Sequence, residues 1–201
     1  MIPIEALLVF AGVYVAALLT PGPGNLAIVA RALASGFWAA APMAFGTLAG
    51  DLVLLTLSAF GLALAAQTLG EFFLVVKLGG AAYLIWLGYR YWTAPTQAGG
   101  PVPGGARQSF LGQFALTLGN PKAIAFFVAL LPSVVDLHSL TLAGYLELCA
   151  VSVLSVPAVM LSYAALASRI RRFLSSERAR GRMNKGAGLV MAGAGVGVAV
   201  T

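Results

Sequence analysis

The chain has 201 residues, of which 60% are apolar and only 9% are charged, and its mean hydropathy is +0.94. Soluble globular proteins carry about 25% charged residues, so this composition excludes a soluble domain. The net charge of +6 comes from basic residues that lie beside apolar segments. That pattern is typical of membrane topology signals and does not indicate nucleic-acid binding.

Six apolar segments follow one another along the chain. At about 20 residues for each crossing, they predict about six transmembrane helices and leave no room for a soluble catalytic domain. The sixth segment is the shortest and is rich in glycine, which favours close packing against another helix and is compatible with a homodimer. The expected fold is an all-α membrane protein with spans at 4–21, 40–65, 72–92, 110–131, 141–167 and 186–201.

Residues 93–109 are rich in Pro, Gly and Gln and predict a flexible linker. The linker divides a single transmembrane domain, residues 1–201, into the halves 1–92 and 110–201 with three spans each. Because each half has an odd number of spans, the second half enters the membrane from the opposite side. This is the arrangement of an inverted-topology repeat.

The basic residues predict how the helices are oriented. They occur in the loops expected after spans one, three and five, whereas the other loops and the termini carry no Lys or Arg. The positive-inside rule therefore places these three loops in the cytoplasm. The basic stretch 169–185 is also compatible with binding to anionic lipid headgroups. The basic residues in these loops are Arg31, Arg90, Arg107, Arg169, Arg171, Arg172, Arg178, Arg180, Arg182 and Lys185.

The first helix of each half is expected to be broken. The breaks are Pro21-Gly22-Pro23-Gly24-Asn25 in the first half and Gly119-Asn120-Pro121-Lys122 in the second. Proline removes a backbone N–H and frees carbonyls, which must be buried in protein or face water. Proline-interrupted helices in corresponding positions point to the binding site of a transporter, although structural kinks remain an alternative.

Four ionisable residues lie within the predicted spans: Asp51, Lys77, Lys122 and Glu147. Because a charge at the membrane centre costs at least about 2.5–3.5 kcal/mol, such residues usually face a cavity or pair with each other. Asp51 is the deepest and is the leading candidate for binding a proton or a cation. Lys122 follows the second break, where it can neutralise Asp51 or meet a substrate carboxylate. Lys77 and Glu147 are nearer the ends of their spans, and Lys77 can instead extend to the interface.

The sequence does not support the other common kinds of functional site. His138 is the only histidine and lies in a predicted external loop, which excludes a histidine-based metal site or a Ser-His-Asp triad within the membrane. Cys149 is the only cysteine, which excludes a disulfide within the chain. No GxxxxGK[ST] motif is present, which excludes ATP-driven transport by this chain alone. We therefore expect no enzymatic activity, cofactor or metal, and expect that an ion gradient supplies the energy.

Three motifs in register resemble those of the LysE/RhtB family of amino-acid exporters, and the likeness extends over the whole chain. The resemblance implies export of amino acids or close derivatives from the bacterial cytoplasm across the inner membrane, by exchange with protons. It also implies that the two breaks line the transport path, and it makes Tyr83 a further candidate for a residue of that path. The motifs are Thr20-Pro21-Gly22-Pro23-Gly24-Asn25, Lys77-Leu78-Gly79-Gly80-Ala81-Ala82-Tyr83-Leu84-Ile85-Trp86-Leu87-Gly88 and Gly119-Asn120-Pro121-Lys122-Ala123-Ile124-Ala125-Phe126-Phe127.

The resulting hypothesis places an amino-acid zwitterion near the membrane centre. Amides at the helix breaks and Lys122 would face its carboxylate, and Asp51 or freed carbonyls would face its ammonium group. Two alternatives remain open. The chain can export another small solute or a cation, with oxygen ligands from Asp51 and Glu147, or it can be a membrane subunit that transports nothing.

Overall fold

The computed structural model describes residues 2–60, 105–136 and 139–173, together with isolated positions between 78 and 93 and between 185 and 196. The described part contains helices and short connections and no strand, which confirms the all-α class. The predicted third and sixth spans and most of the linker fall outside the continuous ranges. The inverted relation of the two halves therefore stays a prediction.

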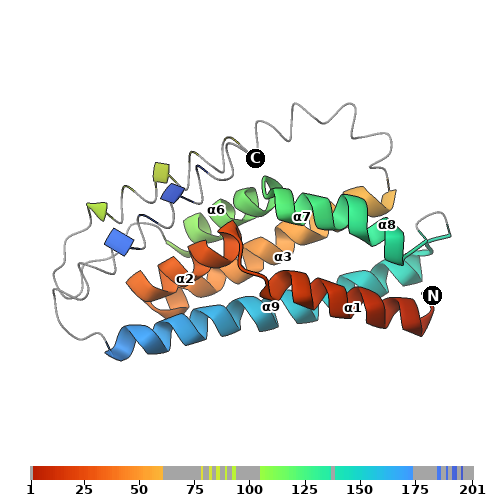
Figure 1. The fold of residues 1–201 in the computed structure, drawn as a ribbon, viewed down its shortest axis with the longest axis horizontal. Coiled ribbons are helices and arrows are strands. Elements are labelled where there is room, and N and C mark those ends of the chain that lie inside the picture. The colour runs from red at the N-terminus through yellow and green to blue at the C-terminus, as the bar shows by residue number, and fades with distance from the viewer. Residues whose placement is uncertain are drawn as a thin grey trace.

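Three stretches are long and apolar enough to cross a membrane within these ranges. Two are single helices, α3 (Phe37–Phe60) and α9 (Leu142–Phe173). The third is the pair α1 (Ile4–Leu19) and α2 (Pro23–Ser35), bent by 54° at the first break. α9 packs against α1, α2 and α3, and Figure 1 shows it running along both members of the bent pair.

The second broken span begins with α6 (Ala106–Leu118), which starts inside the stretch predicted as linker. After the break at Asn120 the chain continues through α7 (Pro121–Ala125), a π-helical turn η1 (Phe126–Leu130) and α8 (Leu131–Val134). In the π-helical turn the Leu131 N–H donates to the Phe126 carbonyl, which leaves the Phe127 carbonyl without its usual partner. The Ser58 hydroxyl donates to that carbonyl at 2.5 Å. π-helical turns frequently occur at functional sites.

The outer surface of these helices carries large apolar side chains. Leu8 on α1 is 64% exposed and Leu154 on α9 is 73% exposed, among many others. A surface of this kind is stable against lipid and not against water, which agrees with the composition.

The prediction of a loop between the first two spans is wrong. Residues 23–35 form α2, and Gly36, with φ of 89°, provides the sharp turn into α3. Arg31, which we expected in that loop, lies on α2 and is only 4% exposed, and its Nε donates to the Ala39 carbonyl at 3.4 Å. Charge counting could not show this, because a basic residue at a membrane interface can be buried in protein as long as its N–H groups find acceptors.

Two glycines allow α3 to lie directly against α6. A β-carbon added at Gly50 would come within 2.7 Å of the Thr117 side chain, and one added at Gly46 would collide with the Phe110 carbonyl oxygen. This is the spacing of small residues that brings membrane helices into close contact. The contact matters for function because α3 and α6 carry several of the polar residues described below.

We expect Gly46→Ala to destabilise the protein by about 1–3 kcal/mol, because the new methyl group forces α3 away from α6. Gly12→Ala is the matched control, since a β-carbon at Gly12 meets nothing within 4 Å. It should leave stability unchanged or raise it slightly, as alanine favours a helix over glycine. Thermal unfolding of the two purified variants in detergent measures the difference. Equal melting temperatures would contradict the packing argument.

Candidate functional site

The first helix break exposes four consecutive backbone carbonyls, and each of them finds a donor. Pro21 and Pro23 have no N–H, so the carbonyls four residues before them lose their helical partners. The Thr20 N–H makes its ordinary helical bond to the Ala16 carbonyl at 3.0 Å and also donates to the first exposed carbonyl, that of Ala17, at 3.2 Å. The next three carbonyls, those of Leu18, Leu19 and Thr20, accept from the side chains of Asn25, Tyr163 and Lys122 at 2.7, 2.7 and 2.5 Å.

The bond from Lys122 joins the two halves of the chain, because Lys122 follows the second break and Thr20 precedes the first. Its stem passes close to Gly22, where an added β-carbon would be 3.7 Å from the Lys122 Nζ. At the second break the Asn120 side chain caps α7 by accepting from the Lys122 N–H at 3.1 Å. Both breaks thus meet at one place, each followed by a helix that begins with proline.

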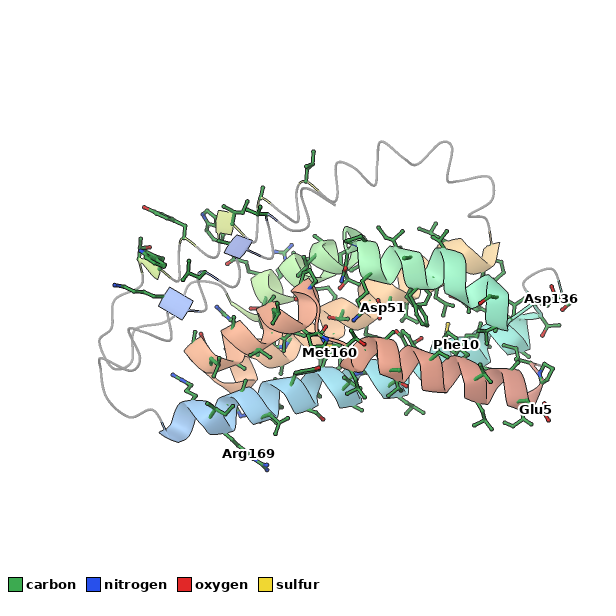
Figure 2. The ribbon with its side chains drawn as sticks, viewed as in Figure 1. Glu5, Phe10, Asp51, Asp136, Met160 and Arg169 are labelled. Atoms are coloured by element: carbon green, nitrogen blue, oxygen red, sulfur yellow. The ribbon has the colours of Figure 1, made fainter. Side chains whose placement is uncertain are left out.

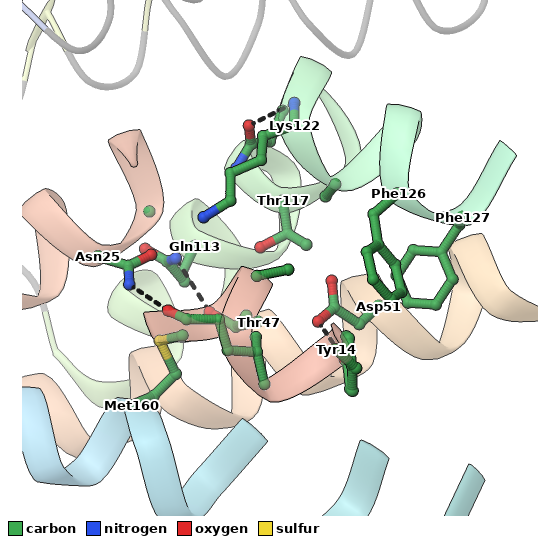
Figure 3. A pocket seen from close by; sticks show the side chains of 15 residues that line it. Tyr14, Asn25, Thr47, Asp51, Gln113, Thr117, Lys122, Phe126, Phe127 and Met160 are labelled. Carbon is green, nitrogen blue, oxygen red and sulfur yellow. Dashed lines mark hydrogen bonds between the residues drawn. The ribbon is translucent and has the colours of Figure 1, made fainter. Parts of the chain in front are cut away.

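A cavity of about 50 Å³ lies where the breaks meet. One water needs about 10–15 Å³ on this measure, so the cavity has room for a few waters and is smaller than an amino acid such as leucine. Figure 3 shows Lys122 extending towards it from one side, with Tyr14 and the two phenylalanines at its apolar end. The polar lining residues are Tyr14, Asn25, Thr47, Asp51, Gln113, Thr117, Asn120 and Lys122.

Asp51 lies on α3 and is only 3% exposed. One of its carboxylate oxygens, Oδ2, accepts a hydrogen bond of 2.6 Å from the Tyr14 hydroxyl. Tyr14 is itself held in place by rings, stacked on Phe10 at 5.4 Å between ring centres and packed on Phe126 at 5.1 Å. A rigid hydroxyl donor therefore orients a carboxyl group that is buried within a membrane span.

Gln113 on α6 is 1% exposed and faces α3. Its Nε2 donates to the Thr47 hydroxyl at 3.0 Å. Its Oε1 is buried and has no hydrogen-bond partner within the ranges that the structure describes. A buried acceptor without a partner costs about 1–3 kcal/mol of stability.

The structure brings most of the predicted site residues together and places one of them apart. Gly24, Asn25, Asp51, Asn120 and Lys122 line the cavity together, and Pro21, Gly22, Pro23 and Pro121 form the adjoining breaks. Glu147 lies apart, where its Oε2 accepts from the Ile2 N–H at 2.9 Å and so holds the N-terminal segment. Lys77 and Tyr83 lie outside the described residues.

Sequence reasoning missed four polar lining residues, which are Tyr14, Thr47, Gln113 and Thr117. A signal for three of them was present, because Thr47 lies four residues before Asp51 and Gln113 lies four residues before Thr117. Residues four apart share one face of a helix, so a polar pair in an apolar helix marks a polar face. In the described part of the chain no three His, Cys, Asp or Glu side chains form a group able to hold a metal ion.

Comparison with known proteins identifies the family. Residues 15–201 match the model of the LysE type translocator family. A membrane protein of Vibrio cholerae is 33% identical over 89% of this chain and 88% of its own length. The homoserine/homoserine lactone efflux protein of Salmonella typhi is 30% identical over 85% of this chain and 84% of its own. The leucine efflux protein of Enterobacter sp. (strain 638) is 33% identical over 60% of this chain and 59% of its own.

No solved structure matches this chain. The family match covers nearly the whole sequence, both breaks and every described residue of the cavity except Tyr14. The resemblance carried by the three motifs is thereby confirmed. The chain belongs to the LysE type translocator family, and it is a membrane transporter and not an enzyme.

Proposed function

We propose that this protein exports amino acids or close derivatives from the bacterial cytoplasm across the inner membrane, in exchange for protons. The observation that carries the proposal is the cavity at the two helix breaks, which is lined by both a buried acid, Asp51, and a lysine, Lys122. The names of two relatives, which are efflux proteins for homoserine and its lactone and for leucine, support this substrate class.

An α-amino acid presents one carboxylate and one ammonium group, and the cavity offers a complementary group for each. The carboxylate would face Lys122 and the amides in the first turn of α2, which have no partner within their own helix. The ammonium group would face Asp51. If the ammonium group and a proton compete for the same carboxylate, the two cannot be bound together. Exchange results when the site changes its side of access only with one of them bound.

Entry of the substrate requires the cavity to widen, because its present volume holds only a few waters. The hydrogen bond from the Lys122 ammonium group to the Thr20 carbonyl links the two helix breaks. A substrate carboxylate would compete with that carbonyl for the same ammonium group. Binding would therefore loosen the contact between the halves, as alternating access requires.

The distribution of charge supports the proposed orientation. Figure 2 shows Arg169 at the opposite end of the molecule from Glu5 and Asp136. We propose that the end with Arg169 faces the cytoplasm, in accord with the positive-inside rule. In this orientation the C-terminal ends of α2 and α9 and the N-terminal end of α6 all lie on the cytoplasmic side.

Purified protein in proteoliposomes tests the proposed function. When the interior is acidic, protons leave as the substrate enters, so labelled leucine or homoserine should accumulate against its gradient. Accumulation should cease when an ionophore removes the pH gradient, and liposomes without protein give the background. Amino acids should also raise the melting temperature, because a ligand that binds only the folded state stabilises it. Stabilisation by divalent cations alone, with no amino-acid flux, would contradict the proposal and favour a cation exporter.

A further inference from the structure

We propose that Thr117 binds the carboxylate of the transported amino acid by donating the hydrogen of its hydroxyl. This inference rests on the proposed function and deepens it, because it adds an uncharged donor that sets where the carboxylate lies relative to Asp51. Thr117 lies on α6, is only 3% exposed and lines the cavity at the helix breaks. The observation behind the assignment is a hydroxyl that faces this cavity and whose hydrogen no described residue accepts.

The Thr117 hydroxyl does not make the bond that four other hydroxyls in α3 and α9 make. A helical serine or threonine often donates to the carbonyl four residues before it. Within the described ranges, the Thr117 side chain makes no hydrogen bond to that carbonyl or to any other group. Its oxygen also differs from the Gln113 Oε1, because neighbouring atoms do not cover it completely. The four hydroxyls with the usual bond are those of Thr47, Thr56, Ser152 and Ser162.

Packing against α3 keeps the Thr117 hydroxyl turned towards the cavity. The methyl group of Thr117 lies in the notch at Gly50, where an added β-carbon would be 2.7 Å from Cγ2. Turning the side chain about its Cα–Cβ bond would take the methyl group out of this notch, because the methyl and the hydroxyl move together. Figure 3 shows the Thr117 oxygen on the side of the cavity that Lys122 enters, with the methyl group turned the other way.

A free hydroxyl hydrogen at this place favours an anion. The hydroxyl can donate to a carboxylate, and a hydrogen bond with a charged partner is stronger than one between two neutral groups. Lys122 lines the same cavity, but it already donates to the Thr20 carbonyl. Thr117 can therefore bind the carboxylate without first breaking a hydrogen bond within the protein.

The position of Thr117 also determines where the ammonium group of the substrate lies. Thr117 packs on Gly50, the residue before Asp51 in α3, and both Thr117 and Asp51 line the cavity. The Asp51 Oδ2 accepts from Tyr14, whereas its Oδ1 has no hydrogen bond to a described residue. In an α-amino acid the carboxylate and the ammonium group are attached to one carbon. A carboxylate held by Thr117 therefore keeps the ammonium group near Asp51.

Substitution by valine and by serine separates a binding role of Thr117 from a packing role. Thr117→Val keeps the branched shape and the methyl group at Gly50 and removes the hydroxyl. It should raise the concentration of unlabelled L-leucine that halves the uptake of labelled leucine about 10- to 100-fold, the effect of one hydrogen bond to a charged group. Thr117→Ser keeps the hydroxyl and should recover most of this inhibition. A packing role predicts the reverse order, with valine like the parent and serine impaired, and this result would overturn the inference.

Two analogues of leucine show which group the hydroxyl binds. Inhibition by 4-methylpentanoate, which lacks the amino group, should weaken in Thr117→Val, and inhibition by isopentylamine, which lacks the carboxylate, should not change. Thr56→Val is the matched control, since it removes a helical hydroxyl that does not line the cavity, and it should behave like the parent.

The analogues and the parent protein give distinguishable failures. Weakening of isopentylamine alone, of both analogues or of neither would overturn the assignment of Thr117 to the carboxylate and leave the proposed function intact. Absence of amino-acid uptake by the parent protein would overturn the proposed function and this inference with it.

Discussion

Asp51→Asn should abolish uptake driven by a pH gradient in proteoliposomes and leave the protein folded. Asparagine has the size of aspartate and can still accept from the Tyr14 hydroxyl, so the packing around residue 51 is preserved. It cannot take up or release a proton, and it cannot balance the charge of an ammonium group. The part of the flux that depends on the gradient should therefore fall to the level of liposomes without protein.

Two further variants show whether this effect is specific to Asp51. Glu147→Gln removes another acid from a membrane helix, but Glu147 holds the Ile2 N–H and does not line the cavity, so gradient-driven uptake should persist. Tyr14→Phe leaves the Asp51 carboxyl in place without its orienting donor. It should slow uptake and leave uptake dependent on the gradient. If Asp51→Asn still couples uptake to the gradient, or if Glu147→Gln loses coupling instead, Asp51 does not carry the proton.

Local chemistry explains why some of the site could be predicted from the sequence. A single proline does not end a helix here, since α3 and α9 continue through Pro42 and Pro157. The breaks follow from proline together with the neighbouring glycine and asparagine residues, a combination that the sequence shows directly. An acid as deep in an apolar span as Asp51 needs a polar environment, whichever helices provide it. The structure brings these independently predicted features to one cavity.

The remaining features depend on contacts between distant parts of the chain. Three such features depend on which helices are neighbours: the π-helical turn that includes Phe127, the hydrogen bond from Tyr163 to the Leu19 carbonyl, and the lack of a partner for the Gln113 oxygen among the described residues. Spacing along one helix could suggest the polar face of α6, but not that Gly46 and Gly50 bring it against α3. For the same reason the sequence ranked Asp51 above Glu147 only by its depth in the span, and could not show that Asp51 lines the cavity whereas Glu147 does not.

Lys122→Met should weaken amino-acid binding about 10- to 100-fold, because the substrate carboxylate loses a charged hydrogen-bond partner. The same substitution also removes the donor to the Thr20 carbonyl, so a purely structural role must be separated from binding. Tyr163→Phe provides that separation. It removes the donor to the adjacent Leu19 carbonyl and leaves every residue that lines the cavity unchanged.

Binding of labelled amino acid to the purified variants, together with their melting temperatures, distinguishes the two roles of Lys122. If the ammonium group binds substrate, Lys122→Met loses affinity, Lys122→Arg recovers most of it by restoring a cation, and Tyr163→Phe binds like the parent. If Lys122 only satisfies a carbonyl at the break, both Lys122→Met and Tyr163→Phe lower the melting temperature and neither changes affinity. The second outcome would remove Lys122 from substrate recognition and would leave the amides of α2 and the Thr117 hydroxyl as the remaining candidates for binding the carboxylate.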